Sequence, residues 1–117
     1  MRISRKEFED AVERALEMIP EMFRVQLNNM TVTVEDQPSQ DLLHEMEMSP
    51  DETLFGVYVG VPLPERSVTE PPLYPDVIMI FQEPLMAACH SLQELEDEIA
   101  VTVVHELAHY LGLSEER

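Results

Sequence analysis

Apolar residues near the start of the chain recur at helical spacing. Between residues 8 and 19 they fall on one face of a helix, and Ser4 and Glu7 have the spacing of a capping box. Pro20 interrupts this pattern. The sequence therefore predicts an amphipathic helix over residues 4–19.

Three later segments have the patterns of β-strands. MTVTVE alternates apolar and polar residues, which predicts a half-buried strand with Val32 and Val34 facing inward. LFGVYVG predicts a second strand, and the apolar run DVIMIF predicts a third, buried one. The stretch from Val61 to Pro75 holds five prolines, which disfavour a helix and predict an ordered loop.

Shorter helices are predicted between these segments. PEMFRVQL predicts a turn of helix that has Pro20 in its first position and is broken by Asn28 and Asn29. Ser39 is placed to cap a short helix through DLLHEM, and EPLMAAC predicts another.

The longest predicted helix lies near the end of the chain. Ser91 and Glu94 form a second capping box, the helical pattern continues to Leu111, and Gly112 is suited to the left-handed residue that ends a helix. A chain of 117 residues suits one core, so we expect a single domain over residues 1–117.

Composition limits the kinds of partner that we expect for this protein and the compartment in which we expect it. The net charge of -17 repels phosphate backbones and anionic lipids, which argues against nucleic acid and membrane partners. Cys89 is the single cysteine, and the N-terminal residues have no apolar stretch like that of a secretory signal. We therefore expect a soluble cytoplasmic protein.

The chemistry of the sequence is concentrated in HELAH, on the last predicted helix. His105 and His109 lie about 40° apart and one turn along, so both imidazoles can reach one zinc ion. Glu106 flanks this pair and can act as general base toward a water that zinc acidifies. The structural alternative is that the two histidines bind no metal and only have their hydrogen bonds satisfied at the edge of the core.

Spacing also limits where the third ligand can come from, because only eight residues follow His109. We therefore expect no ligand from a glutamate on a separate downstream helix of the same chain. If Gly112 turns the chain back, the position ten residues after His105 is Glu115, with Glu116 as its rival.

The other candidate side chains are predicted to stay outside the site. His90 stands roughly 22 Å before His105 along a continuous helix, and His44 is expected at the surface. Cys89 has the character of a small buried apolar residue, and Tyr110 points about 140° away from His105, which favours packing.

The run HELAHYLGLSEE resembles zinc peptidases of the HExxHxxGxx(H or D) kind, the metzincins and Asp-zincins. It is still more similar to a family of small bacterial zincin-like proteins predicted to be metallopeptidases, and this likeness extends to GVPLPERS, YPDVIMIFQEPL and KEFEDAVERALEMIP. The family pattern usually has aspartate where this chain has Glu115, and no metzincin Met-turn is expected.

The resemblance implies a minimal zincin fold of the α+β class. In it a short mixed sheet packs against the active-site helix and the N-terminal helix, and an edge strand borders the cleft. It implies zinc held by His105 and His109, Glu106 as base, and a peptide or protein substrate. Oxyanion partners could come from Tyr58, Arg66 or Tyr74. The alternative function is a zincin-like module that binds zinc or a protein without catalysis.

Overall fold

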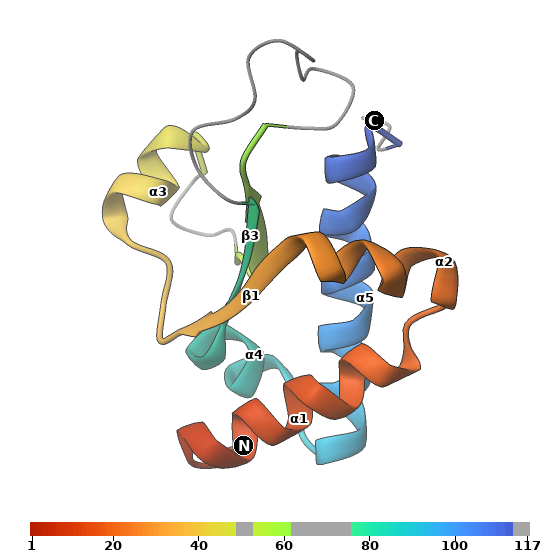
Figure 1. Cartoon of the computed structure of the whole chain (residues 1–117). Coiled ribbons are helices and arrows are strands. Elements are labelled where there is room, and N and C mark those ends of the chain that lie inside the picture. Colours follow the sequence, from red (N-terminus) through yellow and green to blue (C-terminus); the bar gives the residue numbers. More distant parts are fainter. Residues whose placement is uncertain (49–52, 62–75, 114–117) are drawn as a thin grey trace, which may run out of the picture.

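The predicted helices and strands are present in the computed structural model, which describes residues 1–48, 53–61 and 76–113 (Figure 1). In chain order the elements are α1 (Arg5–Met18), α2 (Glu21–Arg24), the 3-10 helix η1 (Val25–Asn29), β1 (Met30–Glu35), α3 (Gln40–Glu45), β2 (Gly56–Val59), β3 (Asp76–Phe81), α4 (Gln82–Ala88) and α5 (Leu92–Leu111).

The three strands form one mixed sheet in the order β1-β3-β2. β1 runs parallel to β3, with Val32 opposite Ile78, and β2 runs antiparallel to it, with Tyr58 opposite Ile78. The last strand in sequence therefore lies in the middle, and β2 is an edge strand of the described sheet. This arrangement confirms the predicted α+β class and the short mixed sheet.

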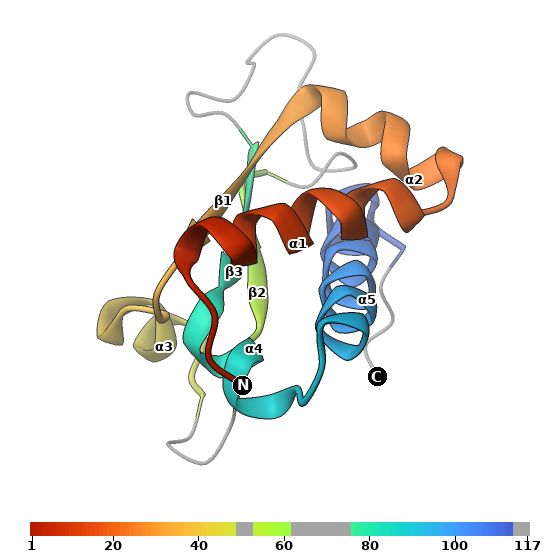
Figure 2. The ribbon, with the colours of Figure 1, turned by 90° about the horizontal axis from the view of Figure 1, so that it is seen from below.

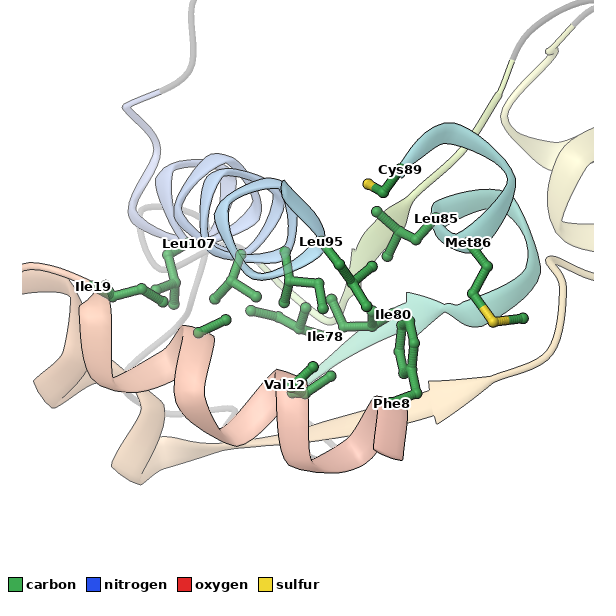
Figure 3. Close-up of a cluster of buried hydrophobic side chains, with 14 residues drawn as sticks. Phe8, Val12, Ile19, Ile78, Ile80, Leu85, Met86, Cys89, Leu95 and Leu107 are labelled. Carbon is green, nitrogen blue, oxygen red and sulfur yellow. The ribbon is translucent and has the colours of Figure 1, made fainter. Parts of the chain in front are cut away.

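One face of the sheet packs against α1 and α5, which contact and cross each other (Figure 2). Ile78 and Ile80 on β3 are fully buried there, as are Phe8 on α1 and Leu107 on α5. Figure 3 shows these side chains meeting others from α4 in a single cluster. The core thus holds α5 against the sheet, which fixes the position of the HELAH segment.

The predicted capping box is complete at the start of α1 but only half formed at the start of α5. Ser4 and Glu7 form the reciprocal capping box of α1. At α5 the Ser91 hydroxyl accepts from the N–H of Glu94, but the Glu94 carboxylate accepts from the N–H of His90 instead of closing a box with Ser91.

The end of α5 also agrees with its predicted signal. Gly112 has φ 76° and ψ 24°, the left-handed conformation. The N–H of Leu113 donates to the carbonyl of Ala108 and that of Gly112 to the carbonyl of His109. These two bonds satisfy carbonyls that the end of the helix would otherwise leave without partners.

Several predicted boundaries were wrong by a few residues. Pro20 is the N-cap of α2 and not its first helical residue, and Asn28 and Asn29 belong to η1 instead of breaking the helix. The loop predicted for residues 61–75 lies almost wholly outside the described residues. Among the described helices, none is both long enough and apolar enough to cross a bilayer.

Candidate functional site

α5 brings the two histidines of the HELAH segment together. Their ring centroids are 4.6 Å apart with the planes at 65°. One potential ligand atom from each of His105, Glu106 and His109 lies within 4.8 Å of the other two. Within the described ranges this is the one such group that could hold a metal ion. The helical geometry expected from the sequence is therefore present.

Glu106 is the buried member of this group, with 7% of its surface exposed. Its Oε1 accepts a hydrogen bond from the backbone N–H of Tyr58 at 2.9 Å and lies 3.2 Å from Nδ1 of His109. Burying a carboxylate is costly unless hydrogen bonds compensate it. The edge strand and the second histidine supply that compensation here.

The contact with Glu106 also bears on the tautomer of His109. A carboxylate only accepts hydrogen bonds, so the short Nδ1 to Oε1 distance favours the tautomer with its hydrogen on Nδ1. Nε2 then keeps the lone pair that a metal ion needs. Metal-binding histidines commonly have such a carboxylate partner on the other ring nitrogen.

The N–H of Tyr58 reaches Glu106 because of the pairing of β2. In an antiparallel ladder, alternate residues direct their backbone groups away from the partner strand. The carbonyl of Phe55 accepts from the N–H of Phe81 at 2.9 Å, so residues 57 and 59 also face β3. Tyr58 therefore presents its N–H on the side away from β3, where α5 passes.

Gly56 allows β2 and α5 to approach this closely. A Cβ at position 56 would lie 2.8 Å from Cγ2 of Thr102 on α5 and 2.9 Å from the carbonyl oxygen of Met79 on β3. Both distances are shorter than normal contacts, so a side chain at this position would push the strand away. No local sequence signal marks Gly56, since its role depends on a helix far along the chain.

We expect Gly56→Ala to lower the free energy of unfolding by about 1–3 kcal/mol, the usual result of overpacking. Urea denaturation measures this change. Thr102→Ser removes the clashing methyl and keeps the hydroxyl that donates to the carbonyl of Glu98 at 2.8 Å, so the double variant should recover part of the loss. Wild-type stability of Gly56→Ala would show that the close approach is not required.

A hollow of about 260 Å³ lies between the beginning of β2 and α5. Gly56, Thr102, His105 and Glu106 contribute to its lining, together with the apolar residues Leu54, Phe55 and Val101. The exposed His105 and the buried Glu106 therefore border the same space. A molecule in this hollow would contact both the imidazole and the carboxylate side of the group.

Not every predicted candidate belongs to this group. Glu115, Glu116, Arg66 and Tyr74 lie outside the described residues, so the third ligand remains a prediction. The hydroxyl of Tyr58 donates to Oδ1 of Asp76 at 2.7 Å, so its backbone N–H is the part of this residue that contacts Glu106.

The other candidate side chains lie outside the group formed by His105, Glu106 and His109. Tyr110 is buried and packs edge-on against the ring of Tyr58, with centroids 5.6 Å apart. His90 and His44 are exposed elsewhere, and neither belongs to the group that could hold a metal ion. Burial raises the pKa of the Cys89 thiol, with smaller contributions from Glu94 and Glu98, and this favours the neutral form expected of an apolar packing residue.

Comparison with known proteins places this site in a family. A conserved hypothetical protein from Thermus thermophilus has a similar fold, with a TM-score of 0.61 and 23% identity over 93% of this chain and 94% of that chain. No curated protein matches the chain significantly. The family model described as zincin-like metallopeptidase matches residues 27–117, well over half of the chain and all of the HELAH segment, so the chain belongs to the zincin-like metallopeptidases.

Proposed function

We propose that the chain is a zinc-dependent peptidase. His105 and His109 would hold the ion together with Glu115, and Glu106 would be the general base. The donor set supports this assignment, because two imidazoles and one carboxylate are the ligands of many catalytic zinc sites. The ligand atoms of His105 and His109 are already close to one another before any ion is considered.

The burial of Glu106 is the observation that carries the proposal. A site that bound zinc only for stability would not need an acid–base group at this position. Yet the fold keeps a carboxylate there at 7% exposure, with a backbone N–H from the edge strand as its partner. The carboxylate also borders the hollow, where it can reach a bound molecule.

The chemistry that follows is hydrolysis of a peptide bond. Zinc, when bound, polarises the scissile carbonyl and acidifies water. Glu106 takes a proton from the attacking water and later delivers it to the leaving amine. The N–H of Tyr58 and the imidazole of His109 hold the Glu106 carboxylate in place between these two steps.

The substrate class proposed is a peptide or a flexible protein segment in extended form. The hollow lies between α5 and β2, and β2 has another strand on one side only within the described sheet. An extended peptide bound in this hollow would pass the carboxylate of Glu106 and the ring of His105. The net charge of -17 favours neutral or basic segments over acidic ones.

Metal analysis combined with a peptide-library assay tests this function. We expect one zinc per purified chain, and cleavage of some library members that a chelator stops and added zinc restores. Zinc-free protein that cleaves equally well, or zinc-loaded protein that cleaves no peptide in a broad library, would contradict the proposal.

A further inference from the structure

A second hollow, of about 530 Å³, lies on the other side of His105, between the end of α1 and α5. Its size is within the range of small-ligand pockets. Among the described residues that line it, every side chain except the imidazole of His105 is apolar. They include Met18, Ile19, Val101, Val104 and Ala108.

This hollow results from a second apolar stripe on α5. One stripe, with Ile99, Val103 and Leu107, is fully buried in the core. The other has residues 101, 104 and 108 at the three- and four-residue spacing that places side chains on one helix face.

The second stripe is only partly covered by the described part of the chain, since Val104 and Ala108 are half-buried while Val101 is exposed. Val101 is 62% exposed, and Met18 across the hollow is 46% exposed. Apolar surface that stays accessible beside a polar site is typical of a binding surface.

The two hollows share lining residues on α5. His105 and Val101 line both this apolar hollow and the smaller one that contains Glu106. A group bound in the apolar hollow therefore lies against the first histidine of the candidate metal site. We propose that this hollow binds one apolar side chain of the substrate, close to the bond that is cleaved.

Charge favours an apolar substrate side chain in this hollow over a charged side chain or a second copy of the chain. No carboxylate or ammonium group of the residues that the structure describes lines the hollow, so none of them would compensate the burial of a charged side chain. A second copy of the chain would bring another net charge of -17, and the repulsion opposes its approach. The fitting ligand is a leucine, methionine or phenylalanine side chain in a neutral or basic peptide.

This inference rests on the proposed function, but binding tests it without turnover. The probes are blocked pentapeptides, acetyl-Ala-Ala-X-Ala-Ala-amide, in which X is leucine, glutamine or lysine. They are titrated into the full zinc-loaded chain carrying Glu106→Gln and followed by methyl NMR. We expect the leucine peptide to bind at least about 10-fold more tightly than the glutamine peptide. It should shift the methyl signals of Val101, Val104 and Ala108.

Two matched variants test whether the preference for the leucine peptide arises in the apolar hollow. Met18→Glu introduces a carboxylate into the lining, and should weaken the leucine peptide by about 10-fold and strengthen the lysine peptide. Met22→Glu makes the same change at a nearby residue that is 67% exposed and does not line the hollow, and should leave both affinities unchanged.

Each other outcome overturns the inference. These are equal affinity for leucine and glutamine, no measurable binding of the leucine peptide, equal effects of the two variants, or a dimer that buries the same methyl groups. Cleavage by wild type with no preference for apolar residues would leave the proposed function in place and remove this specificity. Preferential leucine binding without any cleavage would contradict the proposed function and leave the apolar binding site in place.

Discussion

Glu106→Gln is expected to reduce peptide hydrolysis by about 100- to 10,000-fold, the usual contribution of a general acid–base group, while zinc content stays at the wild-type level. Glutamine has nearly the same shape, and its amide oxygen can still accept from the N–H of Tyr58. It cannot take a proton from water. The loss would therefore come from chemistry and not from folding.

Three measurements on one purified variant check this result: the rate of cleavage, the zinc content and the free energy of unfolding. Asp97→Asn is the matched control, since it makes the same carboxylate-to-amide change at an exposed position on α5. It should cleave like wild type. Equal cleavage by Glu106→Gln and wild type would remove Glu106 from the mechanism.

Glu115→Ala is expected to weaken zinc binding by at least about 10- to 100-fold, because even a residue that only supports a metal ligand typically contributes this much. The left-handed conformation of Gly112 ends α5 where the sequence predicts it, directly after the turn that carries His109. Three residues beyond Gly112 span at most roughly 10 Å, enough to bring Glu115 back to the histidines.

Zinc titrations against a chelator of known affinity measure this effect. Glu116→Ala is the matched control, since it removes the same group one residue further on, and it should cost far less affinity. A chain that ends after Leu113 should lose as much affinity as Glu115→Ala. If all three proteins bind zinc like wild type, the segment after α5 supplies no ligand.

Local signals explain why much of the fold could be predicted. The Ser4 and Glu7 capping box, the apolar stripe of α1 and the alternation in β1 can each be recognised from residues close together in the sequence. The two histidines also belong to this class, because four residues on a helix place them together whatever surrounds them. The predicted helix boundaries were wrong where such signals were weak, as at Asn28 and Asn29.

The support around Glu106 could not be predicted in the same way. Its partner, the N–H of Tyr58, is 48 residues away, and that N–H is available only because the ladder between β2 and β3 directs it outward. Gly56 and the apolar hollow beside His105 likewise depend on how β2 and α1 meet α5. None of these contacts has a local sequence signal.

The sequence by itself determined the helices, the strands and the chemistry of the HELAH segment, since backbone propensity, capping and side-chain spacing act over a few residues. Only the tertiary structure decided that β3 lies between β1 and β2, that Glu106 is buried against the edge strand, and that an apolar hollow borders His105. These features come from packing between segments that are distant in sequence. The core formed by α1, β3, α4 and α5 sets the relative positions of these segments.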